Sequence, residues 1–267
     1  MLSNLLGRNV SYLYGVGFDD HVYRTSAAGG SWIKFNSANI EHLKKIIIRE
    51  EESTGANIIY GIGTDRAVYQ NSAKPGGEWT KVAPPYVTDL AYSNGYLYAV
   101  GPLTPSMPTS GNQVWRTVPN EGSSWSKFTD GDVSKIIIHE DIMYAIGRTD
   151  NAVYQNSATH ESWGWAKVAP PSVTDLAYSN GYLYGVGKNQ VWRIQPCKLC
   201  SNTWTKFTDD GAVGVTKIII HGDIIYGIGS DDQFSHAVYQ TSAISGGPWT
   251  KITNPYVIDL AYSNGFL

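Results

Sequence analysis

Three aspartates and three lysines share one recurring position of this sequence, and their ionisable side chains are candidates for chemistry. Each stands in a repeated phrase that reads V-T-D-L-A-Y-S or V-I-D-L-A-Y-S in one form, and in the other contains K-I-I-I followed by histidine or arginine, as in V-S-K-I-I-I-H. The six residues are Asp89, Asp175 and Asp259, which alternate along the chain with Lys45, Lys135 and Lys217. Carboxylates around one channel can act as general acids and bases, but flanking lysines hold them ionised. We therefore expect a charge-compensated ring that fixes the register of the repeats, with each carboxylate between two ammonium groups.

Histidines near the end of the same phrase are candidates for metal binding. That position is His139, His221 and Arg49 in the lysine phrases, and Ser93, Ser179 and Ser263 in the aspartate phrases. An arginine cannot complete the ligand set that a zinc site needs. We expect these side chains to form hydrogen bonds near the channel mouth, and we expect no metal and no cofactor.

A second alternating set has side chains suited to binding the oxygen atoms of a ligand. Arginine and glutamine both donate hydrogen bonds in a fixed geometry. They alternate at one position of the third apolar run of each repeat, as Arg24, Arg116 and Arg193 against Gln70, Gln155 and Gln240. The alternative role for this set is a hydrogen-bond network on the protein surface.

The elements that position these residues follow from internal repetition. The stretch VTDLAYSNGYLYGVG at 173–187 recurs almost letter for letter at 87–101 and begins again at 257. Each unit contains four short apolar or aromatic runs and spans about 40–47 residues, the size of a propeller blade. The Asn-Gly pairs at 94–95, 180–181 and 264–265 favour two-residue hairpin turns, because both central residues of such turns have positive φ.

The phase of the repeats predicts a closed ring. Six first runs and six W-x-K motifs occur, yet the chain starts with a second run at 11–17 and ends with a first run. Pairing the C-terminal run with the three N-terminal runs completes a blade and removes free sheet edges. We predict an all-β fold in which 1–267 form one domain, a six-bladed β-propeller of four-stranded blades closed by the C-terminal strand. The lysines of the W-x-K motifs then lie on outermost strands, where charge discourages edge-to-edge pairing.

Composition argues against several other classes of protein. The formal net charge is −3, from 20 basic and 23 acidic residues without a run of like charge, which argues against nucleic acid as the main partner. No apolar run approaches the length of a membrane span. The opening MLSNLLGRNV is too short and too polar for a secretory signal, so we expect a cytosolic protein or a processed secreted one. Asn9 begins a glycosylation sequon.

Two cysteines, Cys197 and Cys200, are the only ones in the chain. A structural zinc site needs four ligands, and no second cysteine pair is present. A thioredoxin-like role needs a βαβ context that the sequence lacks. We expect a hairpin loop in which the two thiols are either reduced or joined.

Three phrases carry a resemblance to a known family. They are LYGVGFDDHVYRTS at 13–26, IYGIGTDRAVYQNS at 59–72 and MYAIGRTDNAVYQNS at 143–157. Together with the W-x-K motifs they resemble the tectonin repeat of fish-egg lectins and horseshoe-crab tectonin lectins. The sequence departs from that pattern where the family commonly has asparagine, by having Gly17, Gly63, Gly101, Gly147, Gly187 and Gly229.

The resemblance implies a secreted, non-catalytic lectin with several glycan sites, of the innate-defence or egg-protection type. Glycan recognition needs an aromatic face and a few converging polar groups. Besides the arginine and glutamine set, the candidate contacts are Asp19, Asp65, Asp150, Asp231, Trp115 and Trp192. Because the repeats differ at these positions, we expect three equivalent sites or fewer, and repeated weak sites raise avidity.

Two other functions fit a propeller. One is a scaffold for protein–protein interaction, which the fold alone cannot distinguish from a lectin. The other is a six-bladed hydrolase with its site in the channel, which needs acids, a metal cluster or a nucleophile and base that converge there. We find no such arrangement in the sequence, so the expected partners are glycans or glycoconjugates and the expected protein is not an enzyme.

Overall fold

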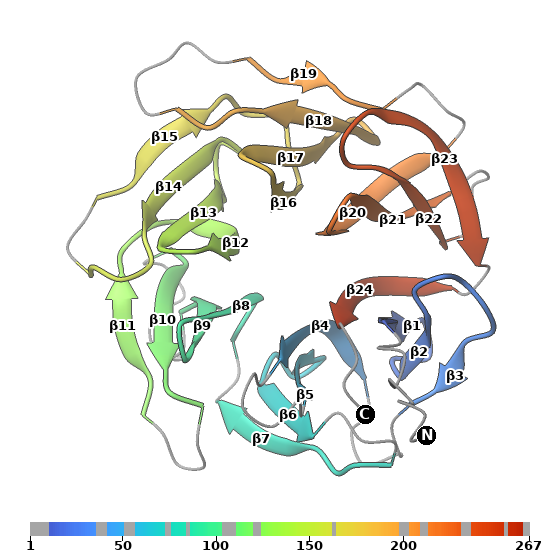
Figure 1. Cartoon of the computed structure of the whole chain (residues 1–267). Helices are drawn as coiled ribbons and strands as arrows, with labels where there is room; N and C mark the ends of the chain where they lie inside the picture. Colours follow the sequence, from blue (N-terminus) through green and yellow to red (C-terminus); the bar gives the residue numbers. More distant parts are fainter. Residues whose placement is uncertain are drawn as a thin grey trace, which may run out of the picture.

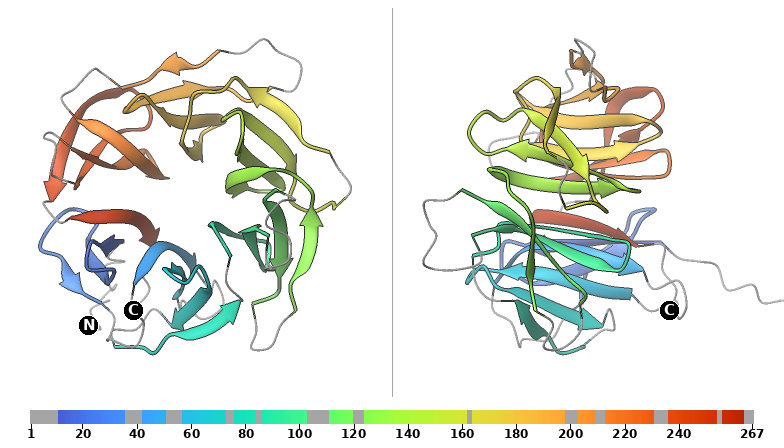
Figure 2. Two further views of the ribbon diagram at one scale, coloured as in Figure 1. Left: turned by 180° about the vertical axis from the view of Figure 1, so that it is seen from behind. Right: turned by 90° about the vertical axis from the view of Figure 1, so that its left-hand side faces the viewer.

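A ring of six β-sheets forms the molecule. The computed structural model describes residues 11–35, 42–50, 57–72, 76–83, 86–102, 111–119, 124–161, 164–197, 203–208, 213–230, 236–253 and 256–263. In this part of the chain, 24 strands form six four-stranded antiparallel sheets around a central axis (Figure 1). Figure 2 shows the same ring from behind and from the side. The predicted all-β, six-bladed propeller is confirmed.

Each blade runs from an innermost strand at the axis to an outermost strand at the rim. Blade 1 contains β24 (Val257–Ser263), β1 (Tyr12–Gly17), β2 (Val22–Ser26) and β3 (Ile33–Lys34). Blade 2 contains β4 (Leu43–Glu50), β5 (Asn57–Gly63), β6 (Val68–Ser72) and β7 (Thr80–Ala83). Blade 3 contains β8 (Asp89–Ser93), β9 (Tyr96–Gly101), β10 (Gln113–Thr117) and β11 (Ser126–Thr129).

The other three blades follow the same order. Blade 4 contains β12 (Val133–His139), β13 (Ile142–Gly147), β14 (Val153–Ser157) and β15 (Ala166–Ala169). Blade 5 contains β16 (Asp175–Ser179), β17 (Tyr182–Gly187), β18 (Gln190–Ile194) and β19 (Thr205–Lys206). Blade 6 contains β20 (Gly214–His221), β21 (Ile224–Ser230), β22 (Ala237–Ser242) and β23 (Gly246–Thr253). Blades 1, 3 and 5 carry the aspartate phrase and are called aspartate blades, and blades 2, 4 and 6 are called lysine blades.

The two ends of the chain meet in blade 1, as the phase of the repeats predicts. Strand β24 pairs antiparallel with β1, and Tyr14 lies opposite Ala261. In Figure 1 the C-terminal red strand completes the sheet formed by the N-terminal blue strands. The hairpin turns also agree with the sequence, because Asn94, Gly95, Asn180 and Gly181 all have positive φ. The third pair, at 264–265, lies outside the described residues.

The hydrophobic core lies between the blades rather than inside any one of them. Between blades 4 and 5, for example, Tyr144 and Ile146 from β13 pack with Leu176 and Leu183 from β16 and β17. Each described blade boundary contains a similar cluster of buried aromatic and branched side chains. A sheet must bury a hydrophobic face against another element, and here each blade does so against its two neighbours.

The alternating charges form a continuous ring around the axis. Each buried aspartate accepts a hydrogen bond from the lysine of the preceding blade, and these pairs are Lys45 with Asp89, Lys135 with Asp175 and Lys217 with Asp259. The last pair has its Nζ and Oδ1 atoms 2.6 Å apart. Burial disfavours the charged form of Lys135, but the nearby charges of Asp175 and Asp89 outweigh it and raise the pKa of Lys135. The predicted charge-compensated ring is therefore present.

Each aspartate also has a contact that the sequence did not predict. Its other carboxylate oxygen binds a backbone N–H of the following blade, whose lysine also lies near enough for its charge to interact with the aspartate, as Lys135 does with Asp89. Oδ2 accepts from Ile136 at Asp89, from Ile218 at Asp175 and from Ile46 at Asp259, at 2.7, 2.8 and 2.7 Å. The amide that donates belongs to the residue directly after the lysine of the following blade. The same strand therefore donates a backbone N–H to one aspartate, while its lysine side chain binds the aspartate of the next blade. Each aspartate thus joins the blades on both sides of it.

Removing one ring carboxylate should weaken the whole fold. We expect Asp259→Ala to lower the free energy of unfolding by about 1–3 kcal/mol, because it leaves the partly buried ammonium of Lys217 without its counter-charge and the buried N–H of Ile46 without its acceptor. Urea denaturation followed by tryptophan fluorescence measures the effect. The control is Asp130→Ala, which removes the exposed partner of Lys127 and should cost about 1 kcal/mol or less. A loss below about 1 kcal/mol for Asp259→Ala, comparable to that control, would mean that the ring does not hold the blades together.

Candidate functional site

The charge ring divides the central channel into two chambers. We call the upper face the side on which hairpins join the second and third strands of each blade. The chamber on this side has a volume of about 460 Å³. Its walls carry the hydroxyl groups of Thr88, Ser134, Thr174 and Thr216. Each of these hydroxyls donates to a carbonyl of its own blade, at 3.2–3.3 Å. The chamber on the lower face has a volume of about 220 Å³ and is lined mainly by isoleucine, leucine and alanine side chains.

The acidic side chains described in the two chambers already have partners. Among the described lining residues, the only acids are the aspartates of the ring, and their oxygens bind lysines and backbone N–H groups. The described residues also contain no group of three or more His, Cys, Asp or Glu placed to hold a metal ion.

The two candidate histidines lie apart on different blades. His139 stacks on Tyr178 of the next blade with 4.1 Å between ring centroids, and His221 stacks on Tyr262 at 3.7 Å. Arg49 lies over Tyr92 in the equivalent place, 4.9 Å from the ring centroid. The three residues therefore link each lysine blade to the aspartate blade that follows it.

The predicted loop aspartates are held by their own blades. In blades 1, 2 and 4 the hydroxyl of a third-strand tyrosine donates to Oδ2 of the aspartate, from Tyr23 to Asp19 at 2.6 Å, from Tyr69 to Asp65 at 2.9 Å and from Tyr154 to Asp150 at 2.7 Å. Oδ1 accepts the backbone N–H two residues later, at 2.9–3.3 Å. Asp231 lies outside the described residues. Both oxygens of these carboxylates thus have partners within the hairpin, and sugar contacts at them remain a prediction.

We call this pair of hydrogen bonds to one carboxylate the aspartate clamp. It shifts the pKa values of both the aspartate and the tyrosine. The N–H of Ala152 and the hydroxyl of Tyr154 hold the pKa of Asp150 below its usual value. In return, the hydrogen bond to Asp19, aided by burial, raises the pKa of Tyr23 to about 12. The clamp also accounts for the glycine that precedes it, because a Cβ atom at Gly147 would lie 2.3 Å from Oδ1 of Asp150.

The arginine and glutamine set occupies the third strands, as predicted. Arginine stands in the aspartate blades and glutamine in the lysine blades, each opposite the central tyrosine of the second strand. The opposed pairs are Tyr14 and Arg24, Tyr98 and Arg116, Tyr184 and Arg193, Tyr60 and Gln70, Tyr144 and Gln155, and Tyr226 and Gln240. The side chain of each arginine faces the following lysine blade, because the tyrosines of blades 3 and 5 donate to the carbonyls of Ala158 and Ala243 there.

Each arginine is enclosed by two aromatic rings. The guanidinium of Arg193 lies 4.7 Å from the centroid of Tyr182 and 4.6 Å from that of Phe207. The sequence analysis did not identify these phenylalanines, although their positions follow a pattern. The W-x-K motif is followed by phenylalanine in the aspartate blades and by valine or isoleucine in the lysine blades.

The predicted tryptophans belong to a different surface, on the upper face. Trp192 and Trp115 occupy the third-strand position that is tyrosine in the other blades, and each indole N–H donates to a carbonyl of the preceding hairpin, at Gly187 and Gly101. The tryptophans of the W-x-K motifs lie beside them and reach the preceding blade, as Trp204 does at the carbonyl of Pro170. An aromatic groove therefore forms where a lysine blade meets the next aspartate blade.

Two such grooves are described, and they are made from equivalent positions. The groove between blades 4 and 5 has a volume of about 290 Å³ and is lined by Pro170, Pro171, Ser172, Val173, Gly187, Lys188, Trp192 and Trp204. The groove between blades 6 and 1 has a volume of about 310 Å³ and is lined by Gly17, Phe18, Asp19, Tyr23, Trp32, Tyr256 and Val257. Phe18 and Tyr256 are 55% and 60% exposed, and their rings meet edge to face. The candidate contacts Trp192 and Asp19 thus line separate but equivalent grooves.

The six lysines of the W-x-K motifs all lie on outermost strands, as expected. They are Lys34, Lys81, Lys127, Lys167, Lys206 and Lys251. In three blades the ammonium lies over the third-strand tyrosine, as Lys81 does over Tyr69 at 5.7 Å. Cys197 is disulfide-bonded, while Cys200 and Asn9 lie outside the described residues. No described helix has the length and the apolar character that crossing a membrane requires.

Comparisons with known proteins support the fold alone. No protein-family model matches the sequence, and no curated protein matches it. The structure is similar to a chain of a nidogen/laminin complex, with a TM-score of 0.67 and 9% identity over 94% of this chain and 98% of that one. It is also similar to YCF48 bound to a D1 peptide, with a TM-score of 0.51 and 10% identity over 80% of this chain and 69% of that one. A puromycin-hydrolysing peptidase of Mycobacterium tuberculosis gives a TM-score of 0.54 and 16% identity over 88% of this chain, but over only 41% of that one.

These comparisons place the chain in one structural class, the six-bladed β-propellers. The three similar proteins have different functions, and at these identities none of their activities transfers to this chain. The tectonin resemblance remains a prediction from the sequence.

The aspartate clamp can be tested through its acidity. We expect Tyr154→Phe to raise the pKa of Asp150 toward the usual value of about 3.9, because the lost hydroxyl stabilises the ionised carboxylate. NMR titration of the side-chain carboxyl carbon measures the shift. Tyr256→Phe, in an exposed ring far from this hairpin, should leave the titration unchanged. An identical midpoint in the wild type and Tyr154→Phe would show that the hydroxyl does not bind the carboxylate.

Proposed function

We propose that this protein is a non-catalytic, multivalent lectin that binds glycans in the aromatic grooves between its blades. The observation that carries the proposal is the recurrence of one groove, with the same wall positions and nearly the same volume, at two boundaries related by the alternation of the blades. Volumes near 300 Å³ suit a small ligand such as a single sugar unit.

The groove between blades 4 and 5 has the groups that sugar recognition uses. The indoles of Trp192 and Trp204 offer apolar faces for sugar C–H groups, and Lys188 beside them offers a donor for hydroxyl oxygens. The backbone at Gly187 packs closely against the loop at Ser172, because a Cβ atom at Gly187 would lie 2.2 Å from the carbonyl oxygen of Ser172. A preformed site of this kind binds with little cost of ordering.

The second groove is similar in shape but different in charge. Phe18 and Asp19 follow Gly17 in this groove, whereas Lys188 follows Gly187 in the first groove. Tyr23 occupies the position that Trp192 has in the first groove. The two grooves therefore favour overlapping but unequal sets of sugars. Sites that are weak singly can together raise avidity by about 10²–10⁴ on a surface that displays many glycans.

A second candidate function is a protein-interaction scaffold. It is favoured by the exposed aromatic pair Phe18 and Tyr256, and by the structures of similar propellers in complexes with laminin or with a peptide. The lectin is preferred because the aromatic rings line confined grooves rather than one extended apolar patch.

The lectin proposal predicts retention of defined sugars on a glycan array and a specific loss in a groove variant. We expect Trp192→Ala to weaken binding of a monosaccharide hit by about 3- to 10-fold, the effect of losing one aromatic face. Trp192→Tyr should retain most binding, since tyrosine occupies this position in four other blades. Isothermal titration calorimetry measures both.

The control for this test is Ile244→Ser, which changes an exposed apolar residue of blade 6 on the lower face and should leave binding of a neutral monosaccharide in the upper grooves unchanged. A blank array, together with a protein captured by the wild type and lost with Phe18→Ser, would support the scaffold and contradict the lectin.

A further inference from the structure

The lower face carries three copies of one cationic cage. In each aspartate blade an arginine lies between a second-strand tyrosine and a phenylalanine, with its guanidinium carbon 4.6–5.2 Å from both ring centroids. The three cages are Tyr12, Arg24 and Phe35 in blade 1, Tyr96, Arg116 and Phe128 in blade 3, and Tyr182, Arg193 and Phe207 in blade 5. In these three blades the arginine also donates a hydrogen bond to the hydroxyl of the central tyrosine, which is Tyr14, Tyr98 or Tyr184. Rings on both sides hold the guanidinium in place, and Arg116 shows that a terminal nitrogen held in this way can still bind a carboxylate.

The cage in blade 3 is already occupied by an acid of the protein. Oε1 of Glu161, from the loop between β14 and β15 of the next blade, lies 2.5 Å from a terminal nitrogen of Arg116. The glutamate side chain is 55% exposed while the arginine side chain is 21% exposed, so the carboxylate reaches the cage from the solvent side. This pair shows how a carboxylate fits the cage.

The cage in blade 5 has the same walls but a different neighbour. The loop of blade 6 that faces it continues after Ala243 with Ile244, Ser245 and Gly246, and none of these is acidic. Among the described residues, no acidic side chain forms an ion pair with Arg193.

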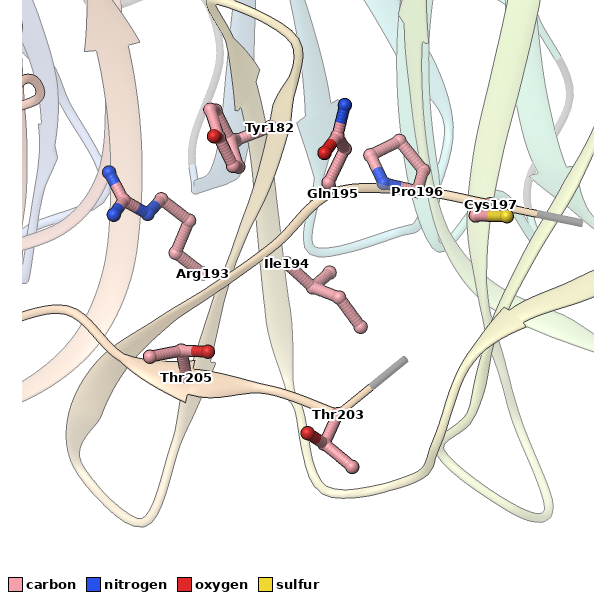
Figure 3. A pocket seen from close by; sticks show the side chains of 8 residues that line it. All are labelled: Tyr182, Arg193, Ile194, Gln195, Pro196, Cys197, Thr203 and Thr205. Carbon is pink, nitrogen blue, oxygen red and sulfur yellow. The ribbon is translucent and has the colours of Figure 1, made fainter. Parts of the chain in front are cut away.

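An open pocket lies at this second cage instead. It has a volume of about 580 Å³ and is lined by Tyr182, Arg193, Ile194, Gln195, Pro196, Cys197, Thr203 and Thr205 (Figure 3). Thr205 lies directly opposite Arg193 on β19, so its hydroxyl shares the face that carries the guanidinium.

The cage in blade 1 gives independent support. The Nη1 atom of Arg24 is buried and has no hydrogen-bond partner in the described part of the chain. A charged donor that is buried and unsatisfied is costly, and bound anions are one way to satisfy it.

We propose that the pocket at Arg193 binds the carboxylate of an acidic sugar, and that Glu161 fills the equivalent site at Arg116 as an internal substitute for such a ligand. This inference rests on the lectin function proposed above, and it names the class of sugar for a site separate from the aromatic grooves. Arginine binds a carboxylate through parallel N–H donors, and the ionised acceptor makes these bonds stronger than neutral ones. The hydroxyls of Thr203 and Thr205 supply further groups for the sugar's own hydroxyls.

The first test removes the cationic group without disturbing the blade. Arg193→Gln introduces the residue that the lysine blades carry at this position, opposite the same kind of tyrosine. We expect glucuronic acid or N-acetylneuraminic acid to bind the wild type and to bind Arg193→Gln roughly 10-fold or more weakly, the effect of losing charge-assisted hydrogen bonds. Arg148→Gln, which alters an arginine of blade 4 outside any cage, is the control and should bind normally.

The second test opens the occupied cage. Removing the internal carboxylate by Glu161→Ala should add one binding site for the acidic sugar per chain, measured as a rise in calorimetric stoichiometry. Glu140→Asn removes the same charge from an exposed turn of blade 4 and should add none. A gain of sites cannot result from a variant that merely unfolds.

The controls separate this inference from the lectin proposal. Neutral-sugar binding that depends on Trp192, with no acidic-sugar binding at all, would overturn the inference and leave the proposed function standing. Equal binding of acetate and the acidic sugars would also overturn it, because the pocket would then hold a bare anion. Tighter binding of a sulfated neutral sugar than of both acidic sugars would overturn the carboxylate assignment. A failure of every sugar to bind would reject both proposals together.

Discussion

The ring of alternating aspartates and lysines is the interaction on which the rest of the structure depends. Each aspartate binds an ammonium from one neighbouring blade and a backbone N–H from the other, so no blade can shift without breaking both contacts. Asp259 belongs to the strand that joins the two ends of the chain, and it therefore couples closure of blade 1 to the register of blades 6 and 2. Buried ion pairs of this kind specify an arrangement more than they stabilise it.

The alternation seen in this ring is also found at the boundaries between blades. With an aspartate in every second blade and a lysine in the others, the two kinds of blade boundary must differ. Where a lysine blade precedes an aspartate blade, the upper face forms an aromatic groove, and where the order is reversed, the lower face forms an arginine cage. In the channel, the ring aspartates are engaged in contacts that hold the blades together. The proposed binding sites lie at the blade boundaries instead.

Much of the fold follows from the sequence, and less of the site does. Period and phase predicted the six blades and their closure, because a repeat of blade size that starts on its second strand can be completed only by its own C-terminus. The alternation of Arg193 and its equivalents with glutamine could also be recognised from the amino-acid sequence. The backbone partner of each ring aspartate was not, since a contact between a side chain and the main chain of another blade leaves no pattern in the residue types.

The sequence analysis also missed several side-chain contacts. Sugar binding at Asp65 and its equivalents stays a prediction, but the hydrogen bond to this carboxylate from the tyrosine four residues later in the same hairpin was not predicted. Glu161 has no counterpart in the other repeats, so periodicity drew no attention to it. The phenylalanine after each W-x-K motif of the aspartate blades was a readable signal, because it follows the same alternation as the arginine.

The most direct test of this account is a crystal structure of the protein soaked with neutral and acidic monosaccharides. We expect neutral sugar in the upper grooves, against Trp192 in one and Tyr23 in the other, and an acidic sugar with its carboxylate at Arg193. Sugar bound in the central channel, or at the aspartate clamps of the lysine blades, would contradict the claim that the alternation of blades places the binding sites at their boundaries.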